Sequence, residues 1–502
     1  MLFVHAVSTR KSQVFILGVI LFSSLCVGQN VRTLGPATTG NTSLTDELTN
    51  LIEVQSQKLK LPGVTVAVVL DRSVIYKGAF GFSDLATKAP RSLEQPQPIG
   101  SITKVFAATM LMQLAERGVV RLDDLVVNYV PEYKVHSPFP NTQPTTLRQL
   151  ASHTSGLPRD AGVNFWMNYT LAGWVFSRGQ VPLQWYVSKE ELLRSLPTVE
   201  LEHEPNSGYY YSNLGICLLA IALERAAGVP YEQYVEANIL KPLGMARSGF
   251  INENNQAQFP VGYVYAPGSE DPLVAPKWKL GVATYTGGIY ATAEDLAQFV
   301  SLQFQVGPVG GSQIISGDSL RAMRLTTGDY SGPDYSAGLG WWGNQVAGHH
   351  IITHNGGHLG YLATASAMPD MKLGVVVLAN RCNPMTDLQT ADLARAIFEF
   401  LVPRLKPEDS KAPFDAAKVN LQAYAGTYAV PGGFAEIRIE QEDGKLYRTV
   451  VGAPGPKTQL YPVAENQFSE APGRPATQVF YSDRDGKITG LSFALFRFDK
   501  LK

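Results

Sequence analysis

Apolar residues in the first part of the chain recur with spacings that distinguish a helix from strands. Residues 43–60 carry leucine and isoleucine at helical spacing, and Ser43 or Thr45 is suited to cap that helix. Residues 64–70 and 74–81 are rich in β-branched and aromatic side chains, and three polar residues separate them. This pattern predicts a β-hairpin after the helix.

The middle of the chain is predicted to be mostly helical. Residues 101–117 place apolar side chains at helical spacing between Gly100 and Gly118, and residues 213–227 show a second such run. Long loops are expected between the helices as far as about residue 300.

Strand-like apolar runs return at residues 351–353, 361–367 and 375–379. Strands at both ends of a helical middle predict one α/β domain, residues 43–405, whose sheet is completed by the two ends of the segment.

The composition changes after this domain. Residues 406–418 are charged and contain proline, which is typical of a linker. Residues 419–502 alternate short β-type runs with turns such as Asp443-Gly444, which predicts a small all-β domain, either a barrel or a half-barrel.

The N-terminus resembles an export signal. Arg10 and Lys11 precede an apolar run, and small residues near Gly28 suit cleavage, so residues 1–28 are interpreted as a signal peptide. The mature protein is then expected to be secreted or periplasmic, with no stable membrane span and a flexible leader at 29–42. The alternative is an uncleaved N-terminal segment that anchors the protein.

Composition and charge narrow the functional class. Apolar residues make up 45% and charged residues 17% of the chain, which is typical of a globular protein. With a formal net charge of −1 there is no basic field, which argues against a nucleic-acid partner. Outside the leader the cysteines are Cys217 and Cys382, which we expect to be buried free thiols.

Ser101 and Lys104 are the first candidate catalytic pair. Residues three apart on a helix share one face, so the lysine amine can lie beside the serine hydroxyl. Serine needs a neighbouring base to act as a nucleophile, and lysine becomes one when burial or nearby positive charge lowers its pKa.

Two further motifs extend this pair. Tyr211 and Asn213 stand at a turn before a predicted helix, where a phenol can shuttle a proton and an amide can hold a substrate carbonyl. His354 lies at the edge of a predicted strand, and the glycines after it, Gly356 and Gly357, allow close approach of a substrate to the backbone.

In this order the three motifs resemble the serine β-lactamase and penicillin-binding protein superfamily. The likeness is closest to the group of class C β-lactamases, D-alanyl-D-alanine carboxypeptidases, D-aminopeptidases and SxxK esterases. It extends over about residues 45–402, and a secondary match is His153-Thr154-Ser155-Gly156-Leu157-Pro158.

The resemblance implies an antiparallel sheet flanked by helices, an all-helical subdomain, and a small lipocalin-like module at the C-terminus. It implies that Ser101 is the nucleophile, Lys104 the base or its electrostatic partner, and Tyr211 the proton shuttle. The remaining roles implied are substrate and lysine contact for Asn213, a polar group across the cleft for His354, and an oxyanion hole from the N–H groups of Ser101 and Gly357. No cofactor and no metal is implied.

One position departs from the family pattern. The third motif is His354-Asn355-Gly356, where relatives have Lys-Thr-Gly or His-Thr-Gly and use the first two residues to bind a substrate carboxylate. We therefore expect a small-molecule or short-peptide acyl substrate, with esters or peptide-like amides favoured over β-lactams. A β-lactamase or D-alanyl-D-alanine carboxypeptidase is the alternative.

Two other classes remain open. Four histidines within residues 349–358 suggest a metal hydrolase, although the surrounding glycines favour strand and loop over a helix that would gather the ligands on one face. A non-catalytic binding or regulatory protein is the second, because a fold does not by itself fix an activity.

Overall fold

The computed structural model describes residues 29–32, 43–405 and 416–501. Within these ranges it leaves out 141, 161–173, 176, 181–185, 267–268, 278, 306–312, 326–327, 330–335, 383–388, 430–435, 452–455, 465, 471, 473–477, 483–486 and 494–495. The predicted signal peptide and most of the predicted linker lie outside the described residues.

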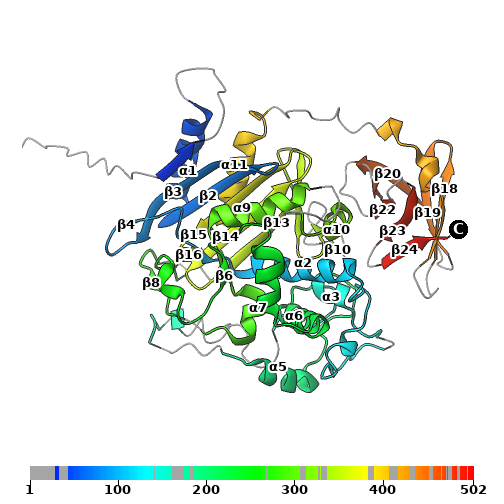
Figure 1. Ribbon diagram of the computed structural model, residues 1–502, viewed down its shortest axis with the longest axis horizontal. Helices are drawn as coiled ribbons and strands as arrows, with labels where there is room; N and C mark the ends of the chain where they lie inside the picture. Colours follow the sequence, from blue (N-terminus) through cyan, green and yellow to red (C-terminus); the bar gives the residue numbers. More distant parts are fainter. Residues whose placement is uncertain are drawn as a thin grey trace, which may run out of the picture.

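An antiparallel sheet forms the centre of the larger part of the molecule (Figure 1). Its strand order is β1-β3-β2-β15-β14-β13-β12-β11-β10, with the short edge strands β1 (Gln29–Arg32), β11 (Ser336–Ala337) and β10 (Gly328–Asp329) at its two ends. The main strands are β2 (Gly63–Leu70), β3 (Ser73–Asp84), β12 (Trp342–Val346), β13 (His349–His358), β14 (Tyr361–Met368) and β15 (Leu373–Ala379). Because β2 pairs with β15, the N-terminal hairpin lies beside the C-terminal strands, and the predicted α/β sheet is confirmed.

The predicted flexible leader is corrected at its start. Gln29–Arg32 forms β1, which pairs antiparallel with β3. The outer edge of β3 would otherwise present unpaired N–H and C=O groups, and an added strand satisfies them.

Helices cover both faces of the sheet. On one face, α1 (Leu44–Lys58) packs against α11 (Gln389–Leu401), and both share a core with apolar residues of β2 and β15. Ser43 caps α1 as predicted, its side chain accepting the Asp46 N–H. On the other face lie α9 (Ala293–Ser301) and, beyond it, the largest apolar core of the molecule.

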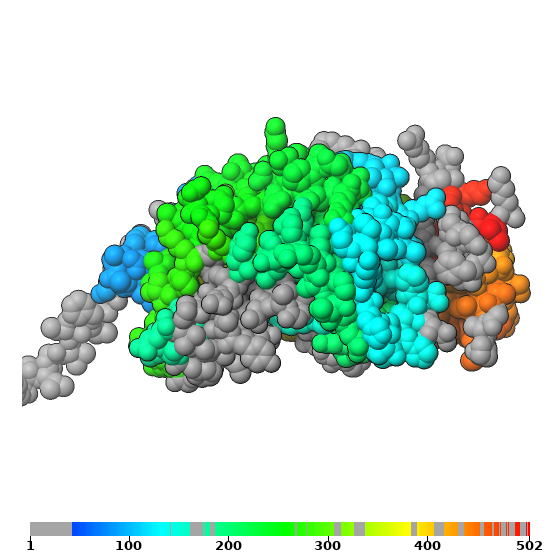
Figure 2. All heavy atoms as spheres, turned by 90° about the horizontal axis from the view of Figure 1, so that it is seen from below, coloured from blue at the N-terminus to red at the C-terminus, as the bar shows by residue number. Residues whose placement is uncertain are grey.

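That core joins the sheet to the helical part of the chain, which forms the face in cyan and green in Figure 2. Its helices are α2 (Thr103–Glu116), α3 (Leu147–Ala151), α5 (Lys189–Ser195), α6 (Asn213–Ala227), α7 (Tyr231–Val235) and α8 (Thr284–Gly287). α6 contacts α2, α3 and α8, and it ends at Gly228, whose φ of 69° suits glycine. Among described helices, only the bent pair Asn213–Ala227 and Tyr231–Leu240 has the length and apolar content of a membrane span.

Shorter elements complete the larger part. These are α10 (Gly317–Met323), β4 (Ala89–Pro90), β5 (Gln97–Pro98), β6 (Gly249–Phe250), β7 (Tyr263–Val264), β8 (Leu273–Val274), β9 (Ile289–Ala291), β10 (Gly328–Asp329), β11 (Ser336–Ala337) and β16 (Arg381–Cys382).

The C-terminal strands close into a separate barrel, in orange and red in Figure 1. They are β17 (Gly426–Ala429), β18 (Glu436–Glu442), β19 (Lys445–Val450), β20 (Thr458–Ala464), β21 (Gln467–Ser469), β22 (Gln478–Ser482), β23 (Ile488–Phe493) and β24 (Phe496–Lys500). Fully buried Tyr428, Phe468 and Phe480 pack edge to face inside it, so aromatic side chains fill its centre. The predicted all-β region is therefore present as a closed barrel with its own core.

A separate core predicts that the barrel can be removed. A chain that ends at Leu405 is expected to unfold cooperatively and still react covalently at Ser101, because the apolar core of the larger part contains none of the barrel's aromatic residues. Thermal unfolding followed by circular dichroism, with active-site labelling of both chains, tests this. Aggregation of the shorter chain in every buffer would show that the two parts share a core.

Candidate active site

Ser101 lies in a single 3-10 turn, Gly100–Ile102, immediately before α2. The predicted helix is corrected at this end, because the α-helical hydrogen bonding begins only at Thr103. Gly100 adopts a φ of +52°, and a Cβ there would lie 2.6 Å from the Gly357 carbonyl oxygen. The tight turn places the half-buried Ser101 where β13 approaches, and Lys104 Nζ is 3.0 Å from Ser101 Oγ.

The Lys104 side chain is fully buried. Its amine donates to the Thr286 carbonyl oxygen in α8 at 2.9 Å. The pKa of Lys104 is lowered to about 7, mainly by burial and to a smaller extent by the charge of Arg159, while Cys217 and Asp160 act in the opposite direction. Near neutral pH a large fraction of this amine is therefore neutral and can accept a proton.

Tyr211 supplies the third group. Its hydroxyl donates to Ser101 Oγ at 2.8 Å, and Lys104 Nζ lies 5.0 Å from the centre of its ring. Ser101 Oγ is thus within hydrogen-bond reach of two groups that can exchange protons with it. The structure brings together the three residues predicted to be catalytic.

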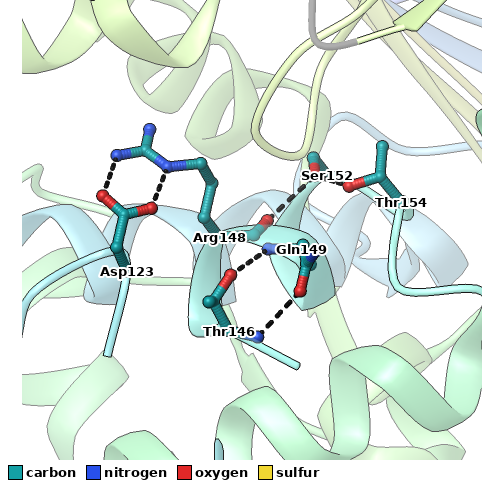
Figure 3. Close-up of polar contacts among 6 residues, drawn as sticks. All are labelled: Asp123, Thr146, Arg148, Gln149, Ser152 and Thr154. Carbon is teal, nitrogen blue, oxygen red and sulfur yellow. Dashed lines mark hydrogen bonds and ion pairs between the residues drawn. The ribbon is translucent and has the colours of Figure 1, made fainter. Parts of the chain in front are cut away.

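A short helix and its loop support Tyr211. In α3, Thr146 and Gln149 form a capping box, and Arg148 pairs with both oxygens of Asp123 at 2.7 and 2.9 Å (Figure 3). Ser152 Oγ donates to the Arg148 carbonyl at 2.9 Å. These contacts fix the point at which the chain leaves α3 and enters the loop 152–160.

His153 connects that loop to Tyr211. Its Nδ1 accepts the Ser212 N–H at 3.0 Å, and its carbonyl accepts the Tyr210 N–H at 2.8 Å. The buried ring stacks against that of Tyr211 with 4.7 Å between centres. Burial lowers the pKa of His153 well below its ordinary value, so the ring is neutral and serves to hold the tyrosine.

Asn213 is held by the end of the same loop. Its side-chain nitrogen donates to Asp160 Oδ1 at 2.8 Å, and its backbone N–H donates to the Arg159 carbonyl. Burial raises the pKa of Asp160, and the hydrogen bond from Asn213 opposes that shift. The predicted contacts of Asn213 with lysine and substrate remain predictions, since this side chain is engaged by Asp160.

His354 lies on the sheet side of the site. It is 1% exposed, stacks on Trp342 with 4.2 Å between ring centres, and donates from Nδ1 to the Asn355 carbonyl. Burial, and secondly the charge of Lys104, lowers the pKa of His354 to about 3. At any pH near neutrality it is therefore a polar group without charge.

The backbone of β13 runs close to the turn that carries Ser101. A Cβ on Gly356 would lie 1.8 Å from the Ile99 carbonyl oxygen and 3.2 Å from the Ser101 nitrogen, so no larger residue fits there. Gly357 is exposed, and a Cβ added to it would meet no atom within 4 Å. The two proposed oxyanion donors, the N–H groups of Ser101 and Gly357, therefore belong to segments in direct contact beside open space.

Asn355 faces the other side of the sheet. Successive side chains on a strand alternate, so His354 and Asn355 point to opposite faces. Asn355 Oδ1 accepts from Thr364 on β14, which in turn bonds Thr390 on α11. A substrate contact by the Asn355 side chain remains a prediction that this orientation does not favour.

The four histidines within residues 349–358 do not come together around a possible metal site. On a strand, positions four apart are about 13 Å apart, so His350, His354 and His358 cannot share one ion. Among the described residues, no group of three or more His, Cys, Asp or Glu side chains is arranged to hold a metal. Cys217 and Cys382 are both buried and take part in no disulfide, as expected.

Comparison with known proteins assigns the family. The family model described as β-lactamase matches residues 48–399. The chain belongs to the β-lactamase family. Penicillin-binding protein 4* of Bacillus subtilis (strain 168) is 26% identical over 440 residues, covering 84% of this chain and 90% of that protein. Putative beta-lactamase-like 1 of Homo sapiens is 29% identical over 413 residues, covering 79% and 76%.

Solved structures agree with this assignment. The octameric penicillin-binding protein homologue from Pyrococcus abyssi has a TM-score of 0.59 and 25% identity, covering 90% of this chain and 99% of that one. The β-lactamase/D-alanine carboxypeptidase from Yersinia pestis has a TM-score of 0.58 and 26% identity, covering 72% and 100%. The predicted β-lactamase/transpeptidase-like fold is confirmed.

Several residues that shape this β-lactamase-family site were not identified from the sequence. Thr286 acts only through its carbonyl, and Arg159 and Asp160 belong to no motif of the resemblance. Their position in the sequence could have indicated a role in the site, because Arg159 and Asp160 directly follow the recognised motif that begins at His153.

The burial of Lys104 predicts a pH-dependent cost in stability. Its pKa is about 7 in the fold and about 10.4 in the unfolded chain. Below pH 7 both states are protonated and the fold bears the full cost of a buried charge. As pH rises from 7 to about 10.4 the unfolded state binds more protons, so stability rises through that window.

We therefore expect Lys104→Met to raise the thermal midpoint, with a larger gain at pH 6 than at pH 10. Thermal unfolding at both pH values measures this, and the exposed Lys241→Met is the matched control, for which no such difference is expected. An equal gain at the two pH values, or a loss at pH 6, contradicts the argument.

Proposed function

We propose that the protein is an exported serine hydrolase that forms an acyl-enzyme on Ser101 and cleaves esters or peptide-like amides. The observation that carries this proposal is the hydrogen bonding of Ser101 Oγ to both the buried Lys104 amine and the Tyr211 hydroxyl. Export rests on the apolar N-terminal run of the sequence, and a small-molecule or short-peptide acyl donor is the expected substrate.

The proposed reaction uses these groups in two steps. Ser101 Oγ attacks the substrate carbonyl carbon while its proton passes to Lys104 or Tyr211, and the oxyanion accepts from the N–H groups of Ser101 and Gly357. The bond to the leaving group then breaks, and the leaving group takes up that proton. Water hydrolyses the acyl-Ser101 ester in the second step and regenerates the serine.

A β-lactamase or D-alanine carboxypeptidase activity is the second candidate. It is favoured by the names of two relatives, penicillin-binding protein 4* and the Yersinia pestis β-lactamase/D-alanine carboxypeptidase, each 26% identical to this chain. Against it stands the sheet side of the site. His354 has no charge near neutral pH, and the Asn355 side chain bonds Thr364.

Covalent labelling tests whether the protein is an enzyme of this class. A fluorophosphonate probe is expected to label the purified protein on Ser101, and Ser101→Ala should abolish labelling without changing the thermal midpoint. Ser195→Ala, on α5, should label like the wild type. An adduct on another serine would defeat the assignment of Ser101 as the nucleophile. The absence of any adduct would support a non-catalytic binding or regulatory protein.

The choice between the two activities is tested by a ranking of substrates. We expect kcat/KM to be highest for a p-nitrophenyl ester, lower for a D-alanyl peptide and lowest for nitrocefin. A β-lactam carboxylate held at β13 finds no cation at His354 and no hydroxyl at Asn355, and one missing charge-assisted hydrogen bond costs about ten- to a hundredfold. A wide margin in favour of nitrocefin would identify a β-lactamase instead.

A further inference from the structure

A permanent cation stands on the helical side of the reactive serine. The guanidinium carbon of Arg159 lies 5.5 Å from the centre of the Tyr211 ring, and the Tyr211 hydroxyl bonds Ser101 Oγ. Its charge reaches the catalytic lysine, since Arg159 is among the groups that lower the pKa of Lys104. The side chain is 59% exposed, so a solute can reach it.

On the sheet side of the same site, the described strand β13 places no such charge beside Ser101. His354 is neutral near pH 7, and it is stacked on Trp342, which itself lies 6.3 Å from the Tyr211 ring. In relatives that bind a carboxylate, this strand provides the cation. Here the order across the site is Arg159, Tyr211, Trp342, His354, with the permanent positive charge at the opposite end from β13.

The guanidinium retains donors for a ligand. Its Nε faces Asp160 Oδ2 at 3.3 Å, and Asp160 is occupied on its other oxygen by Asn213. Arginine carries five N–H donors in a planar fork that suits a carboxylate. Within the described chain, the Asp160 contact engages the Nε edge, which leaves the two terminal nitrogens directed to other acceptors or to solvent.

We propose that Arg159 binds an anionic group, in the first place a carboxylate, on the leaving-group side of the substrate. The side is set by Tyr211, because a phenol that returns a proton to the leaving group must lie beside it, and Arg159 lies over that phenol's ring. This inference rests on the proposed function and names its substrate class. Among esters with the same acyl group, those whose leaving group carries a carboxylate are preferred over those whose leaving group is neutral.

A matched set of esters tests the inference. The acetyl ester of 3-hydroxybenzoate carries an anionic leaving group, the acetyl ester of 3-hydroxybenzamide is its neutral partner, and monophenyl succinate places the carboxylate on the acyl side. Rates are compared at pH 9, where Lys104, with its pKa of about 7, is neutral in wild type and variant alike. The measured quantity is the ratio of kcat/KM for the benzoate ester to that for the benzamide ester.

We expect Arg159→Gln to lower this ratio about ten- to a hundredfold, the value of one charge-assisted hydrogen bond. Arg159→Lys, which keeps the charge but loses the fork, should retain part of the ratio. The matched control is Arg225→Gln at the far end of α6, about 18 Å along the helix from Asn213 and paired with Glu132 at 2.7 Å. Its ratio should equal that of the wild type.

Three results would overturn the inference. An equal fall for both acetyl esters would mean that Arg159 only neutralises Asp160 and so holds Asn213. A selective loss on monophenyl succinate would place the anion on the acyl side. An unchanged ratio would remove Arg159 from recognition altogether. Failure of the proposed function is distinct from all three, because hydrolysis of every ester would then survive Ser101→Ala.

Discussion

The site depends on a lysine amine that has no access to water. Burial is the first cause of the low pKa of Lys104, and an amine in that environment must find partners inside the protein. It finds them in the Thr286 carbonyl and in Ser101 Oγ. Helices α2 and α8 are therefore held in one arrangement by the same atom that serves the chemistry. A buried lysine such as Lys104 lowers the stability of the fold. Its presence here is explained by its proposed role as the base that accepts a proton from Ser101.

A second constraint is the placement of the Tyr211 hydroxyl beside Ser101 Oγ, because the two residues lie 110 positions apart in the sequence. The loop 152–160 achieves this by pairing with the segment before α6 through backbone and side-chain bonds on both sides of the tyrosine. The loop is in turn fixed at its origin by the capping box of α3 and the Arg148–Asp123 pair. The phenol is thus positioned by buried polar contacts, which lose their geometry steeply if one partner is removed.

The sequence predicted those parts of the site that depend on local spacing. Ser101 and Lys104 are three residues apart at the start of α2, and the 3-10 turn that carries Ser101 keeps the one-turn spacing that was predicted from the sequence. The sheet and the barrel also followed from runs of β-branched and aromatic residues. In contrast, the continuation of β13 through Gly356 and Gly357 was not predicted, because glycine weakens a strand signal and the close approach of Ile99 and Ser101 that requires Gly356 is a tertiary contact. Arg159 and Asp160 could not be assigned either, since their role arises only when their loop folds against Tyr211 and Asn213.

The same tertiary arrangement explains how His354-Asn355-Gly356 is compatible with an intact catalytic centre. A lysine at position 354 would place a second cation close to Lys104. The closeness is seen in His354, whose pKa is lowered by the charge of Lys104. That second cation would help to keep Lys104 unprotonated. In this protein the pKa of Lys104 is lowered mainly by burial, and to a smaller extent by the charge of Arg159 on the helical side of the site. The chain therefore needs no charge on β13 to maintain a neutral base. With the cation at Arg159 instead of on β13, the site attracts an anion from the helical side. The proton transfers at Ser101 are the same in both arrangements.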